Sequence, residues 1–81
     1  MNRLEAFRAI GNQTIYAKAF KRLTRDEVAL CEELIAKHDG LDFHEFAKMA
    51  NRCFMDKPKT KNFTTVIEFL NVANITHQQH Q

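Results

Sequence analysis

The segment DGLDFHEFAKMAN, residues 39–51, contains the signals that decide how this chain folds. Its Gly40 follows a helical pattern whose last turn carries Lys37 and His38. Glycine adopts the left-handed conformation that commonly ends helices, and basic side chains are stabilised near the negative end of the helix dipole. The segment therefore predicts the end of one helix, with Gly40 in the left-handed conformation.

The rest of the same segment predicts the start of a second helix. Asp42 is a favoured N-cap residue, and Glu45 stands three residues after it. This is the spacing of a capping box, in which each side chain accepts a hydrogen bond from the backbone amide of the other residue. Leu41 and Phe46 flank the box at the spacing of a hydrophobic staple. We therefore expect two helices joined by a short turn.

The same helix-start signal occurs at two earlier places in the chain. Thr24 is followed three residues later by Glu27, and Asn2 is followed in the same way by Glu5. The chain has only two glycines and one proline, which argues against a turn-rich β fold. The repeated start signals indicate an all-helical protein.

Apolar residues recur at three- and four-residue intervals through most of the chain. Helical regions are expected at residues 3–22, 25–38, 43–54 and 63–74. Weak helix formers at residues 11–13 predict a break in the first region, so the number of helices is four or five. We expect a compact all-α bundle with no sheet. Its single domain covers residues 1–76, and residues 77–81 form a flexible polar tail.

Two apolar stretches predict how their helices pack in the bundle. Ile15 falls in a helical stripe with Tyr16 and Phe20, so we expect it to face the core. Residues 63–75 are apolar nearly all round, which is typical of a central helix that others cover. Alternatively, one side of this helix is left for a partner. Self-association would then use Val66, Phe69 and Val72.

Charge is distributed unevenly along the sequence. Residues 1–25 carry six basic side chains against one acidic side chain, and residues 26–45 carry seven acidic side chains against one lysine. Residues 46–81 are again basic, and the formal net charge of the whole chain is +2. An acidic middle between two basic ends favours charged partners.

Composition and length narrow the class of protein. The chain has 81 residues and is 44% hydrophobic, which is ordinary for one small globular domain. The only thiols are Cys31 and Cys53, and no charged-then-apolar leader pattern begins the chain, so we expect a cytoplasmic protein with reduced cysteines. The longest apolar segment, residues 63–75, is too short to cross a bilayer.

No motif indicates catalysis, a cofactor or a metal. The candidate metal ligands lack the paired spacing of zinc sites; they are Cys31, His38, His44 and Cys53. Helix capping already explains the neighbouring carboxylates of Asp42 and Glu45. We therefore expect a protein that is not an enzyme and has neither a metal site nor a cofactor.

The central segment also resembles a helix-turn-helix over residues 34–52. The motif's small residue, turn glycine and buried apolar positions would be Ala36, Gly40, Leu41, Phe46 and Met49. The resemblance implies that the second helix would enter the major groove, with Arg52 near a phosphate. The acidic balance of residues 26–45 opposes such docking, because phosphates would be repelled.

The sequence therefore favours a small non-catalytic interaction protein, an adaptor or inhibitor that docks on a larger protein or assembly. An accessory protein of a phage or mobile element would fit this size. The expected contacts are Lys18, Lys21, Arg22, Arg25, Glu32 and Glu33. The alternative is a nucleic-acid-binding regulator, whose contacts would be His44, Lys48, Arg52, Lys57, Lys59 and Lys61.

Overall fold

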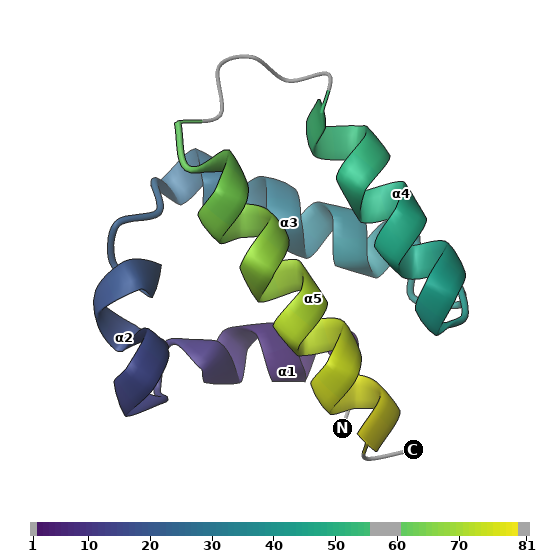
Figure 1. Ribbon diagram of the computed structural model, residues 1–81, viewed down its shortest axis with the longest axis horizontal. Helices are drawn as coiled ribbons and strands as arrows, with labels where there is room; N and C mark the ends of the chain where they lie inside the picture. The colour runs from purple at the N-terminus through teal and green to yellow at the C-terminus, as the bar shows by residue number, and fades with distance from the viewer. Residues whose placement is uncertain (1, 56–60, 80–81) are drawn as a thin grey trace.

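The computed structural model describes residues 2–55 and 61–79, and within these ranges the chain forms five helices and no strand (Figure 1). This confirms the expected all-α bundle. The helices are α1 (Arg3–Ile10), α2 (Thr14–Phe20), α3 (Arg25–Lys37), α4 (Phe43–Met55) and α5 (Phe63–Gln79). The last helix continues through His77 and Gln78 to Gln79, beyond the expected end near Asn74.

Each of the three helix-start signals forms a capping hydrogen bond, and at one of them the full capping box is present. The backbone amide of Glu5 donates to Asn2 Oδ1 at 2.8 Å, and the amide of Glu45 donates to Asp42 Oδ1 at 2.8 Å. At the start of α3 both halves of the capping box are formed between Thr24 and Glu27. Local side-chain acceptors therefore fix where α1, α3 and α4 begin.

The prediction for Gly40 is wrong, because no described glycine has a positive φ. Helix α3 ends at Lys37, and the C-cap is His38, with φ −121° and ψ 24°. The turn that follows is held by a distant side chain: the guanidinium of Arg3 donates to the carbonyls of Asp39 and Leu41. Hydrogen bonds from Arg3, together with the amide of His38 that caps the last turn of α3, thus hold a turn that contains no left-handed glycine.

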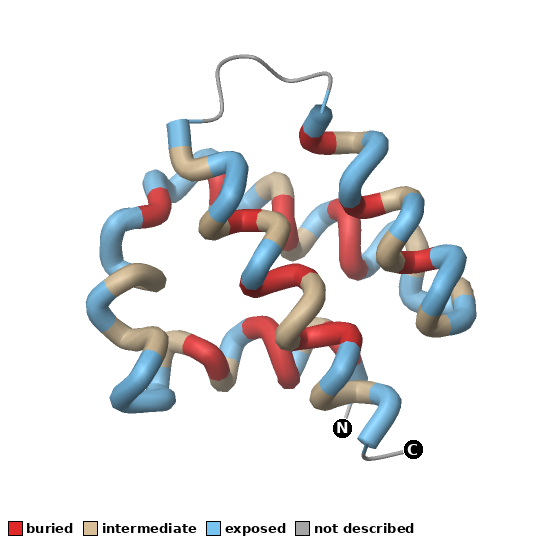
Figure 2. Tube along the Cα trace, in the orientation of Figure 1, coloured by how far each residue is buried: buried red, intermediate tan, exposed pale blue. Residues whose placement is uncertain are grey.

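The expected break in the first helical region is present, between Ile10 and Thr14. Gly11 lies against the ring of Phe20, where a Cβ would come within 3.2 Å of a ring carbon. The expectation for Ile15 is wrong, since its side chain is 79% exposed. Figure 2 shows buried positions in every helix except α2. Helix α2 is short and packs on the core through one side, and Ile15 lies on the opposite, solvent-exposed side.

Helix α5 is the centre of the bundle, as predicted, and packs against α1, α4 and α3. Its Phe69 is fully buried and lies 5.7 Å, centroid to centroid, from the rings of both Tyr16 and Phe20. Val66 is also fully buried. The hypothesis of self-association through Val66, Phe69 and Val72 is therefore wrong, because the monomer's own core covers Val66 and Phe69 completely and Val72 is half-buried.

Candidate interaction surfaces

Exposed cations gather where α2 ends and α3 begins. Lys18, Lys21, Arg22 and Arg25 are all exposed, and none of them forms an ion pair with a described residue. These are the basic side chains that the sequence proposes as partner contacts. Their charges remain available because no acidic group of the described chain neutralises them by direct contact.

A hydrogen-bonded joint brings Lys61 to the same place. Glu27, near the start of α3, accepts from the backbone amide of Asn62 at 3.1 Å and from its side-chain amide at 2.9 Å. Asn62 also donates to the backbone carbonyl of Arg22 at 3.3 Å. The start of α5 is thereby attached to the α2–α3 connection (Figure 1), and Lys61 immediately precedes the joint and is exposed.

We call the resulting surface the basic face: Lys18, Lys21, Arg22, Arg25 and Lys61. The first four residues are the basic partner contacts that the sequence predicts, and Lys61 is a contact that the sequence predicts for the nucleic-acid alternative; the hydrogen bonds of Asn62 bring the two sets together. Lys57 and Lys59, which the same alternative names, lie outside the described residues. Ile15 precedes Lys18 by one turn of α2, so the most exposed large apolar side chain of the described residues stands beside these cations.

Glu27 is the acidic group of this joint, and it is 5% exposed. Burial alone would raise the pKa of its carboxyl group, but the hydrogen bonds from Thr24 and Asn62 outweigh burial, and the pKa lies below its ordinary value. The carboxylate is thus held in the charged form as a structural acceptor. Sequence reasoning found its role as a cap of α3 but not its hydrogen bonds with Asn62, the residue before α5.

The acidic residues proposed as contacts occupy different environments. Glu32 is half-buried and pairs with Arg8, with 3.0 Å between the carboxylate oxygen and the guanidinium nitrogen. Glu33 is exposed and forms no ion pair with a described residue. The carboxylate of Glu32 therefore already has an ion-pair partner within the chain, whereas the carboxylate of Glu33 is available to a partner protein.

Three residues of the nucleic-acid alternative lie along α4. His44, Lys48 and Arg52 are exposed and spaced by four residues, which puts them on one side of the helix. In the helix-turn-helix resemblance Ala36 would be a small packing residue, but it is exposed. Helices α3 and α4 make little direct contact with each other. The side chains of His44, Lys48 and Arg52 are thus accessible to a ligand. The helix packing of a helix-turn-helix motif, however, is not reproduced.

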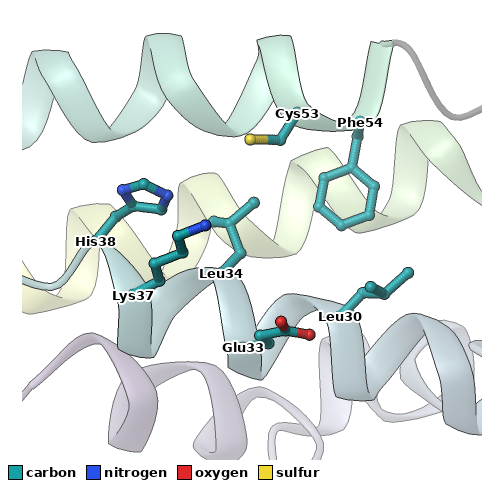
Figure 3. Close-up of a pocket in the computed structure, with 7 residues that line it drawn as sticks. All are labelled: Leu30, Glu33, Leu34, Lys37, His38, Cys53 and Phe54. Atoms are coloured by element: carbon teal, nitrogen blue, oxygen red, sulfur yellow. The ribbon is translucent and has the colours of Figure 1, made fainter.

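A groove remains between α3 and α4, and it encloses about 180 Å³. Figure 3 shows Leu30 and Leu34 from α3, and Cys53 and Phe54 from α4, extending into the space between the two helices. The remaining residues that line the groove are polar: Glu33, Lys37 and His38. It is a mainly apolar recess with charged edges.

At the other end of the molecule Arg3 is buried and joins α1 to α5 and to the turn before α4, a role that only its spacing along the sequence could have indicated. The side chain is 1% exposed; Nε donates to Asn74 Oδ1 at 3.0 Å, and the guanidinium carbon lies 4.5 Å from the centre of the Phe46 ring. Asn74 in turn donates to the carbonyl of Phe43 at 2.9 Å. Burial lowers the pKa of Arg3, and the carboxylates of Asp39 and Asp42 oppose this shift.

A second cavity of about 300 Å³ lies beside this network, between the start of α4 and the end of α5. Arg3 and Asn74 at its wall already have hydrogen-bond partners. Arg3 is one of the six basic side chains of residues 1–25, but it shares a helical stripe with Phe7 and Ile10. That spacing is the signal that could have identified it as buried.

The two thiols differ in accessibility, so they should react with a thiol reagent at different rates. Burial raises the pKa of Cys31 to about 12, and the carboxylates of Glu27 and Glu32 add to this effect. Cys53 is only half-buried, at the edge of the groove. We expect a thiol reagent to modify Cys53 in the native protein at least about a hundredfold faster than Cys31.

Mass spectrometry of tryptic peptides after a timed reaction with iodoacetamide measures both rates in one sample. Denaturant should make the two rates similar. Equal rates in the native protein would contradict the burial of Cys31.

The described residues hold no group of three or more His, Cys, Asp or Glu side chains that could bind a metal ion. Within residues 2–55 and 61–79, no helix combines the length and apolarity needed to cross a membrane. No protein-family model, curated protein or solved structure matches this chain.

Proposed function

We propose that this chain is a non-catalytic interaction protein, an adaptor or inhibitor, that docks on an acidic surface of a larger protein or assembly. The observation that carries the proposal is the basic face. Its five cations come from the end of α2, the start of α3 and the residue before the Asn62 joint. None of them is paired with a described acidic group, so a partner's carboxylates would meet charges that are still free.

The neighbourhood of the basic face supports a protein partner. Ile15 is 79% exposed beside Lys18, so the surface offers an apolar contact next to positive charge. Protein interfaces commonly surround an apolar anchor with polar and charged groups, and complementary charge increases the rate of association. The hydrogen bonds between Glu27 and Asn62 hold the two parts of the face in a fixed relation.

The test is affinity capture from extracts of the native host with two matched variants. Lys21→Glu/Arg25→Glu reverses two charges of the basic face, and an acid at position 25 is favourable in the first turn of α3, so the fold should persist. Lys48→Glu/Arg52→Glu reverses two exposed charges on α4 and is the control. We expect a protein that the parent and the control capture, and that the basic-face variant loses by at least about tenfold.

Equal capture by all three proteins would contradict the proposal. Circular dichroism on each variant confirms that the helices are retained. Addition of salt should weaken capture by the parent, because exposed charges are screened.

A second candidate function is a nucleic-acid-binding regulator. It is favoured by the exposed row of His44, Lys48 and Arg52 on one side of α4. Electrophoretic mobility shift with DNA and RNA across a salt series tests it. In this experiment Lys48→Glu/Arg52→Glu is the test variant and Lys21→Glu/Arg25→Glu is the control. Salt-steep binding that Lys48→Glu/Arg52→Glu abolishes would support this function in place of protein docking.

A further inference from the structure

Ile15 is an apolar side chain that the fold itself does not use. It is 79% exposed, and within the described part of the chain it belongs neither to the core nor to the partly buried apolar residues that pack against the core. Its neighbours on α2 behave differently, since the rings of Tyr16 and Phe20 both lie against Phe69. A β-branched residue is also a weaker helix former than alanine. Neither packing nor helix propensity therefore accounts for an isoleucine at this position.

The position of Ile15 ties it to the basic face. Helix α2 lies at the edge of the bundle, on the far side from α4 (Figure 1), so its exposed side chains project outward. Lys18 follows Ile15 by three residues, and side chains at this spacing are neighbours on a helix, with Cβ atoms about 5–6 Å apart. A surface that covers Ile15 would therefore also meet the ammonium group of Lys18.

The cations of the basic face are suited to attract a partner but not to retain it. An exposed ion pair changes an equilibrium constant by about fivefold or less, and salt screens it. Complementary charges mainly increase the rate of association, whereas well-packed apolar contacts at the centre of an interface slow dissociation. A lasting complex through this face therefore needs an apolar contact, and Ile15 is the side chain that can provide it.

We propose that Ile15 anchors the complex by inserting into an apolar recess of the partner, and that Asp or Glu carboxylates on the rim of this recess face Lys18 and the other cations. This inference rests on the proposed function and specifies the partner's surface. An acidic surface alone does not fit, because it would leave Ile15 in water. The cations set the rate at which the complex forms, and Ile15 sets its lifetime.

The rate of release from immobilised protein tests the anchor. Ile15→Ala is the test variant, and Met55→Ala is the matched control, since Met55 is 76% exposed at the end of α4 and neither side chain packs on the core. Each protein is loaded with native host extract and then washed with buffer, and the captured protein that remains is measured over time. We expect Ile15→Ala to release it at least about tenfold faster than the parent, and Met55→Ala to match the parent.

Poly-L-glutamate is a second probe, because it offers carboxylates but no apolar recess. At low salt the parent and Ile15→Ala should bind it equally, as fluorescence anisotropy of the labelled polymer would show. Lys21→Glu/Arg25→Glu should bind it at least about tenfold more weakly. If Ile15→Ala also loses this binding, the residue acts through the shape of the basic face and the proposal is wrong.

The release experiment separates failure of the anchor from failure of the proposed function. A captured protein that the charge-reversal variant loses, but that Ile15→Ala and the parent release at the same rate, would overturn the anchor and leave docking through the basic face intact. Equally fast release from Ile15→Ala and Met55→Ala would also overturn the anchor, because any exposed apolar side chain would then serve. If no captured protein responds to Lys21→Glu/Arg25→Glu, the proposed function fails and the anchor fails with it.

Discussion

Replacement of Arg3 by methionine should lower the free energy of unfolding by about 3 kcal/mol. The guanidinium group donates to the carbonyls of Asp39 and Leu41 and to the side chain of Asn74. Methionine keeps much of the volume but provides no donor. Asn74 is 1% exposed, so its oxygen would lose its partner without gaining free access to water.

Arg8 supplies the matched control for Arg3. It is in the same helix, but its side chain is 61% exposed, and its ion pair with Glu32 is open to solvent. Arg8→Met should therefore lower the free energy of unfolding by less than about 1 kcal/mol. Urea unfolding followed by circular dichroism measures both variants. If both cost the same, the Arg3 hydrogen bonds do not stabilise the fold.

Replacement of Glu27 by glutamine should also have a large effect: it should lower the free energy of unfolding by about 2 kcal/mol at neutral pH. The carboxylate oxygens accept hydrogen bonds from the amide of Thr24 and from both the backbone and side-chain amides of Asn62. The NH₂ group of glutamine cannot accept a hydrogen bond. At least one donor in a buried joint would then lose its acceptor.

The effect of Glu27→Gln should depend on pH in a defined direction. The pKa of Glu27 in the folded protein lies below its ordinary value of 4.5. The folded state therefore prefers the carboxylate, and its stabilising contribution is complete above that ordinary value and is lost as the pH falls through the folded-state pKa. The difference in unfolding free energy between parent and variant should be constant well above pH 4.5 and should shrink as the pH falls below that value.

The matched control is Glu68→Gln, the same chemical change at an exposed position of α5. It should change stability by less than about 0.5 kcal/mol at neutral pH. Urea unfolding of all three proteins at several pH values gives the comparison. A parent–variant difference for Glu27 that stays constant down to about pH 3 would contradict the linkage between its carboxylate and the joint.

Much of the fold could be predicted because its signals are local. Each helix-start signal joins residues three positions apart, such as Asp42 and Glu45, and the three signals placed α1, α3 and α4. The apolar character of α5 predicted its central position. The sequence also names the exposed cations of the basic face, but it assigns Lys61 to a different function from the other four and does not predict the hydrogen bonds of Asn62 that bring them together.

The surfaces were harder to predict because burial depends on which helices meet. Ile15 and Val66 look alike as members of apolar stripes, yet one is 79% exposed and the other is fully buried. The helix of Ile15 is short and meets the bundle with one side, whereas the helix of Val66 is covered from several directions. Spacing along one helix cannot show how many neighbours that helix will have.

The sequence by itself determined that this chain is helical, where its helices begin and where its charges lie. Only the tertiary structure decided the conformation of Gly40, the burial of Arg3 and the meeting of Glu27 with Asn62. The reason is the range of the interactions. A capping hydrogen bond spans three residues, whereas Arg3 bonds to partners 36, 38 and 71 residues away, and Glu27 to one 35 residues away. Bonds of that range form only after the helices have packed, and they fix the turn between α3 and α4 and the position of the basic face.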